Sequence, residues 1–90
     1  MIRNVYVLTC TLIGWINGVA SKKNPVCFEV IPTYDRSEIE RLFSNRLSEY
    51  NAEVVFSEEY EDDEIQMVAV GVHPDDGVKV TIQVETTIMH

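Results

Sequence analysis

Apolar and polar residues alternate along most of the chain with the period of two that is typical of β-strands. The alternation is clearest over residues 78–88, where Val, Ile and Thr occupy one set of positions and mainly polar residues the other. Over residues 4–13 neither set carries a charge, so we expect this strand to be central in a sheet or covered on both faces. Shorter runs predict strands at 26–31, 52–57 and 65–70.

Between the first two predicted strands we expect a loop. Gly14 interrupts the first apolar run, and Gly18 and Pro25 are residues that break regular structure. In the strand after Pro25, the alternate apolar side chains should face inward and Glu29 outward. The inward set is Val26, Phe28 and Val30.

One segment has the period near 3.6 of an amphipathic helix. Its apolar stripe is Ile39, Leu42, Phe43, Leu47 and Tyr50. The sequence allows two alternative capping boxes at the start of this helix, one that pairs Ser37 with Glu40 and one that pairs Asp35 with Glu38. Asn51 is suited to a left-handed stop. The predicted order is β-(loop)-β-α-β-β-β, a single α+β domain over residues 1–90 with a mostly antiparallel five-stranded sheet and the helix on one face.

The charge is divided unevenly between the two halves of the chain. Residues 1–46 hold six basic and four acidic residues, a net of +2, whereas residues 47–90 hold one basic and eleven acidic residues, a net of −10. An acidic surface repels nucleic acid and anionic membranes and attracts basic partners. We therefore expect no direct nucleic-acid binding and no membrane association.

The acidic residues are densest in the turn predicted between residues 52–57 and 65–70, with two more in the next turn. The candidate partner-binding residues are Glu53, Glu58, Glu59, Glu61, Asp62, Asp63, Glu64, Asp75 and Asp76. Alternate strand residues lie about 6.7 Å apart, so Glu53, Glu59 and Glu61 would form a row spaced like backbone phosphates. No basic residue occurs nearby in the sequence to neutralise them. The alternative is a solvated tip that aids solubility and prevents edge pairing.

The sequence offers no residue set for catalysis, a cofactor or a metal. None of the glycine spacings of a phosphate-binding loop occurs, and His73 has no second ligand at metal spacing. Cys10 and Cys27 lie in apolar strands, where we expect two buried, reduced and unreactive thiols. Trp15 is either a core residue or an interface anchor. We expect a protein that is not an enzyme.

The N-terminal segment has two interpretations. Arg3, an apolar run and small residues up to Ala20 resemble a signal peptide, which would make the protein secreted. The β-branched residues of the run favour a strand instead. A run of about 12 residues is too short to span a bilayer. We expect a cytoplasmic protein, with secretion as the alternative.

In size and acidity the chain resembles small inhibitor proteins that phages and bacteria direct against nucleic-acid enzymes. These include DNA-mimicking anti-restriction proteins, anti-CRISPR proteins, and immunity proteins or antitoxins that mask nuclease toxins. The resemblance is one of size and charge, with no shared motif, and carries no residue over. It implies an inhibitor that occludes a basic nucleic-acid-binding site of a target enzyme in a bacterial or phage-infected cell. The alternative is a structural module that forms a homodimer through a sheet edge.

Overall fold

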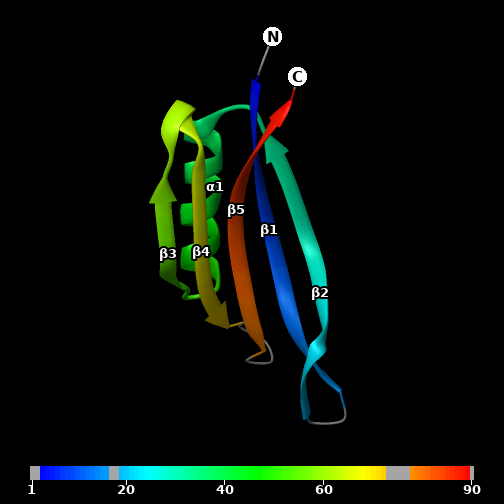
Figure 1. Cartoon of the computed structure of the whole chain (residues 1–90). Coiled ribbons are helices and arrows are strands. Elements are labelled where there is room, and N and C mark those ends of the chain that lie inside the picture. Colours follow the sequence, from blue (N-terminus) through cyan, green and yellow to red (C-terminus); the bar gives the residue numbers. More distant parts are fainter. Residues whose placement is uncertain (1–2, 17–18, 73–77, 90) are drawn as a thin grey trace.

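The fold was analysed in a computed structural model that describes residues 3–16, 19–72 and 78–89, with the side chains of 13–16, 19–26 and 89 left out. Its elements are β1 (Arg3–Ile16), β2 (Val19–Thr33), α1 (Arg36–Glu49), β3 (Glu53–Glu59), the short 3-10 turn η1 (Glu61–Asp63), β4 (Ile65–Val72) and β5 (Lys79–Met89). The strands form one sheet in the order β2-β1-β5-β4-β3, and all neighbours are antiparallel. The predicted α+β class and element order are confirmed (Figure 1).

The strand predicted at the N-terminus is indeed interior, because β1 lies between β2 and β5. Its register with β5 pairs Val5 with Thr87 and Leu8 with Val84. Residues directly opposite one another share a face of the sheet. The side chains of Tyr6, Leu8 and Cys10 therefore lie on the same face as the apolar side chains of β5, and all three are buried.

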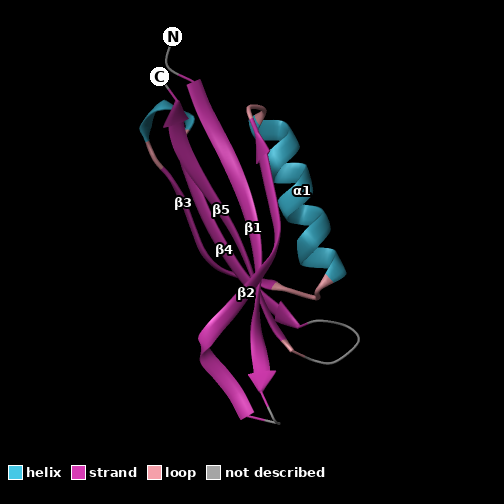
Figure 2. Cartoon of the chain, turned by 90° about the vertical axis from the view of Figure 1, so that its right-hand side faces the viewer, coloured by secondary structure: helices cyan, strands magenta, loops and turns pink. Residues whose placement is uncertain are grey.

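The helix covers one face of the sheet and leaves the other uncovered (Figure 2). The core lies between α1 and the covered face. Its largest fully enclosed side chains are Leu8, Cys10, Ile39, Val80, Ile82 and Val84. The predicted helix stripe is confirmed, because Phe43 and Tyr50 are buried and Leu42 and Leu47 pack against the core. We call the two sides the covered face and the open face.

The two ends of α1 show which sequence signals act. Asp35 is the N-cap, and its carboxylate accepts a hydrogen bond from the backbone N–H of Ser37 at 2.9 Å. The capping residue is therefore Asp35, the second of the two predicted starts, because it keeps an extended backbone while Ser37 is already helical. At the other end Asn51 has φ of 48°, which confirms the left-handed stop.

Gly71 permits the chain after α1 to lie close to β4. A Cβ atom at this position would stand 2.5 Å from the carbonyl oxygen of Tyr50 and 2.8 Å from Cβ of Ala52. The backbone N–H of Val72 donates to the same Tyr50 carbonyl at 3.0 Å. The end of the helix is thus fastened to β4 by backbone contact that any larger residue would obstruct.

The predicted loop over residues 15–25 is wrong, because β1 and β2 continue through it as a long hairpin. Gly14 falls at a shift in the β1–β2 register and does not end β1. Pro25 is tolerated because β2 is an edge strand, where one side needs no ladder hydrogen bonds. Since the β1–β5 pairing ends at Leu12, the hairpin projects past the other strands as a two-stranded arm (Figure 1).

The predicted orientation of β2 is wrong at Glu29 and Val30 and holds only in part for Phe28, which is 40% exposed, while the side chain of Val26 lies outside the described residues. Glu29 lies opposite Cys10 on the covered face, and Val30, opposite Thr9, faces outward and is 59% exposed. The cause is a bulge at Phe28, where the register shifts by one residue. Phe28 still contacts the helix end, with its ring edge-on to Tyr50 at 6.1 Å between centroids.

Candidate partner-binding surface

The acidic connection between β3 and β4, which we call the acidic tip (Glu58–Glu64), has a defined backbone conformation. The N–H of Tyr60 donates to the carbonyl of Glu64 at 2.7 Å, and that of Glu64 to the carbonyl of Glu61 at 3.3 Å. Asp62 and Asp63 both have left-handed backbones, with φ of 60° and 61°. Aspartate adopts this region more readily than most residues, which explains its use at these two positions.

Side chains from β1 hold the acidic tip in place. The Asn4 amide donates to the carbonyl of Asp62 at 2.6 Å, and the Tyr6 hydroxyl donates to the carbonyl of Asp63 at 2.9 Å. Tyr6 is itself buried in the core. The two left-handed residues are therefore fastened to the central part of the sheet, across 58 and 57 residues of sequence.

Arg36, at the start of α1, is a basic neighbour that the sequence order concealed. Its guanidinium pairs with Asp63 at 3.0 Å and with Glu40 at 2.9 Å, and it also forms an ion pair with Glu59. No basic residue lies near the acidic tip in the sequence, but the fold brings Arg36 to Glu59 and Asp63. These two carboxylates fasten the tip to the helix, and the remaining ones carry its net charge.

The predicted row of carboxylates along β3 does not form. Glu53 lies opposite Val70 on the open face, whereas Glu59 lies opposite Ile65 on the covered face. The register shifts between Val54 and Phe56, so one extra residue in β3 reverses the faces of the residues that follow. Glu58, opposite Gln66, shares the open face with Glu53.

The acidic tip forms a shallow hollow of about 590 Å³ that is largely open to solvent and is lined by Glu59, Tyr60, Glu61, Asp62 and Glu64. Within the described part of the chain, Glu61, Asp62 and Glu64 form no ion pair. The Tyr60 hydroxyl donates to a Glu58 oxygen at 3.0 Å, and this bond raises the pKa of Tyr60. A concave surface with unpaired carboxylates and an aromatic ring suits a lysine or arginine side chain.

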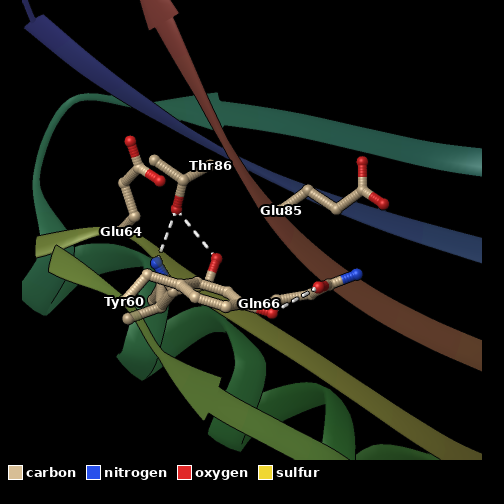
Figure 3. A pocket seen from close by; sticks show the side chains of 6 residues that line it. Tyr60, Glu64, Gln66, Glu85 and Thr86 are labelled. Carbon is tan, nitrogen blue, oxygen red and sulfur yellow. Dashed lines mark hydrogen bonds between the residues drawn. The ribbon is translucent and has the colours of Figure 1, made fainter.

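A smaller pocket of about 170 Å³ lies beside the tip (Figure 3). Thr86 lines this pocket, and its hydroxyl is already bonded within the protein, because it accepts from the N–H of Ile65 at 2.9 Å and donates to the carbonyl of the same residue at 2.8 Å. Glu64 and Glu85 lie on either side of it in the view. Sites for small molecules usually measure about 300–1,000 Å³. This pocket is smaller than that, and we therefore assign it no small-molecule ligand.

Of the predicted site residues, the structure gathers Glu58, Glu59, Glu61, Asp62, Asp63 and Glu64 at the acidic tip. Glu53 lies apart from them at the start of β3. Asp75, Asp76 and His73 fall outside the described residues, as does the side chain of Trp15. The roles of Asn4, Tyr6 and Arg36 could not be predicted from local patterns, because each residue contacts the tip across more than twenty residues of sequence.

The prediction of two buried thiols holds for one cysteine only. Cys10 is buried on the covered face, whereas Cys27 lies opposite Thr11 on the open face and is exposed. Burial, and after it the nearby Glu29 carboxylate, raises the pKa of the Cys10 thiol from 9.0 to about 12. Glu29 in turn accepts two hydrogen bonds from Arg46, at 2.6 and 2.9 Å, and these lower the pKa of Glu29.

Among the described residues, no three His, Cys, Asp or Glu side chains are grouped so that they could hold a metal ion. No helix in that part of the chain has the length and apolar character needed to cross a membrane. Comparisons with protein-family models, with curated proteins and with solved structures gave no match.

Proposed function

We propose that this protein is a non-enzymatic inhibitor that binds a basic surface of a protein partner and occludes a nucleic-acid-binding site there. The partner would be a nucleic-acid-processing enzyme, including a nuclease toxin, in the cytoplasm of a bacterial or phage-infected cell. The observation that supports this proposal is the acidic hollow, whose three unpaired carboxylates lie on a backbone held in place at Asp62 and Asp63.

Fixing the acidic tip in advance favours binding. A mobile acidic loop would lose conformational entropy when it docks, whereas a tip already held by Asn4, Tyr6 and Arg36 has less freedom to lose. Like charges held close together also repel one another, and a basic partner relieves that repulsion. Both effects are largest for a partner with clustered lysine and arginine side chains.

The carboxylates do not reproduce the even spacing of a nucleic-acid backbone, because the shift in β3 separates Glu53 from the acidic tip. The proposed mimicry is therefore one of charge and position. It requires only that carboxylates of the acidic tip occupy the place where the partner would otherwise hold a phosphate.

Dimerisation through the β3 edge is less well supported. β3 is the last strand in the sheet order and all seven of its residues are exposed, which leaves an edge open for pairing. However, the extra residue in β3 interrupts the ladder, and three of the seven residues are glutamates. Bulges and charges on an edge strand both oppose pairing with a second chain.

The test uses two variants, in each of which two carboxylates are replaced by neutral amides. Each variant is used to capture proteins from a cell lysate. The tip variant carries Glu61→Gln and Asp62→Asn, which preserve shape and leave the ion pairs of Arg36 intact. The matched control carries Glu38→Gln and Glu49→Gln on the exposed side of α1. The wild-type protein and the control should capture the same nucleic-acid-binding protein at low salt.

The tip variant should bind the captured protein about tenfold more weakly, because two charge contacts are lost. Its affinity should also depend less steeply on salt, since fewer charges remain to be screened. Equal affinity and equal salt dependence for both variants would contradict the proposal.

A further inference from the structure

Apolar side chains gather on the open face of β3 and β4, beside the acidic tip. The residues of this open-face patch are Val55, Phe56, Val68, Val70 and Val72. The exposed fractions are 62% for Val55, 42% for Phe56 and 47% for Val72. The helix packs on the other side of the sheet, so α1 does not cover the patch (Figure 2).

The extra residue in β3 enlarges this patch. Because Val54 lies opposite Ala69 and Phe56 opposite Val68, Val55 has no partner of its own in β4. In such a bulge two residues of one strand stand against one residue of the other, here Val55 and Phe56 against Val68. Bulges re-aim side chains in this way beside functional sites. Two large apolar groups are thus exposed together at one point.

Carboxylates border the patch. Glu53 lies opposite Val70, Glu58 lies opposite Gln66, and Glu85 lines the pocket next to Gln66. Lys79 stands opposite Val72, at the end farthest from the acidic tip. An apolar centre within a polar, charged rim is the usual anatomy of a protein interface. Here the rim is acidic, and it continues into the acidic tip through Glu58.

We infer that the open-face patch is an anchor for the same partner that the acidic tip binds, and that the partner segment carries apolar side chains between lysines or arginines. This inference rests on the proposed function and adds the kind of segment that is recognised. The apolar side chains of that segment contact Phe56 and its neighbours, while its basic side chains pair with Glu58, Glu85 and the tip. A nucleic-acid duplex offers no such apolar groups to bury, so the patch selects a protein.

Charge also decides against a second copy of this chain as the occupant. Each copy carries a net charge of −8, and a face-to-face dimer would bring two acidic rims together. Like charges placed against each other at an interface cost several kcal/mol. A basic segment meets no such repulsion.

The experiment uses two synthetic peptides of equal length and charge as probes. In one, lysine alternates with leucine, and in the other, lysine alternates with serine. Each peptide is titrated into the isotope-labelled protein while backbone amide signals are recorded by NMR. The alternating lysine–leucine peptide should bind about fivefold more tightly than the lysine–serine peptide. The chemical-shift changes that only the lysine–leucine peptide causes should fall on the backbone amides of Val55, Phe56, Val68 and Val70.

Two variants locate the effect. Val55→Thr with Phe56→Ser should bring the two peptides to equal affinity, and Val30→Thr, on the open face of β2, should leave the difference unchanged. Equal binding of both peptides by the wild-type protein would overturn the anchor and leave the proposed function intact. Binding of neither peptide would contradict both. Concentration-dependent dimerisation that the double variant abolishes would show that a second copy covers the patch, and would overturn the inference.

Discussion

The covered and open faces of one sheet show how differently a single set of strands is used. On β5, Val80, Ile82 and Val84 face the helix and are fully enclosed, while the residues between them face outward. Phe43 and Phe56 make the same contrast with identical side chains, one buried against the sheet and the other 42% exposed on it. The covered face accounts for folding, and the open face with the acidic tip remains available for a partner.

The contrast also separates two kinds of charge. On the covered face, Arg46 and Glu29 pair directly and are largely shielded from solvent. At the acidic tip, one arginine serves two of the carboxylates and three others stay unpaired in the described part of the chain. A structure that needed charge only for stability would pair it. The excess at the tip is the charge on which the proposed function depends.

The two phenylalanines give the largest expected difference in stability. Phe43→Ala removes a buried ring and should lower the free energy of unfolding by about 3–5 kcal/mol. Phe56→Ala removes an exposed ring and should lower it by less than about 1 kcal/mol. Chemical denaturation of both variants measures the difference. Similar losses for the two variants would show that the faces are wrongly assigned.

The shielded ion pair should make stability depend on pH. Hydrogen bonds from Arg46 lower the pKa of Glu29 below its usual value near 4.5 in the folded state. The stabilisation is therefore complete above pH 4.5 and is lost as the pH falls through the lower, folded-state pKa. Glu29→Gln should cost about 1–3 kcal/mol at neutral pH and flatten this acid dependence.

Glu38→Gln is the control for this prediction, because it removes a carboxylate from an exposed ion pair with Arg41. Exposed pairs contribute about 0–1 kcal/mol, so its unfolding curve should follow the wild type at every pH. Thermal unfolding of the three proteins from pH 3 to 7 gives the comparison. An unchanged acid dependence in Glu29→Gln would contradict the assignment.

The two cysteines should differ in reactivity because they lie on opposite faces. Cys27 is exposed, whereas Cys10 is buried and has a pKa raised to about 12. Since the thiolate is the reactive form, iodoacetamide at about pH 8 should modify the folded protein once per chain and the unfolded protein twice. Intact mass spectrometry counts the adducts. Modification of folded Cys27→Ser would show that Cys10 is accessible.

Periodicity was enough to predict the covered face. The stripe of α1 and the alternation in β5 each follow from one local pattern, and both are confirmed. The extent of β1 and β2 is not predicted, because Gly14 and Pro25 are residues that usually end strands. The dipeptide Asn17-Gly18 between the two strands is the sequence signal that favours a hairpin there.

The open face and the acidic tip were harder to predict for a physical reason. A single extra residue reverses the faces of a strand, and nothing in the local composition near Phe28 or Val55 marks such a shift. The partners of the tip come from β1 and α1, far away in sequence. Acidity could be read from the sequence, but the division into paired and unpaired carboxylates required the fold.

Competition with DNA tests the central claim most directly. The partner isolated by capture is bound to a labelled DNA duplex, and increasing amounts of wild-type protein, the tip variant (Glu61→Gln, Asp62→Asn) or the helix control (Glu38→Gln, Glu49→Gln) are added. The wild type and the helix control should release the DNA at equal concentrations, and the tip variant should need about ten times more. Simultaneous binding of DNA and the wild-type protein to the partner would contradict the account.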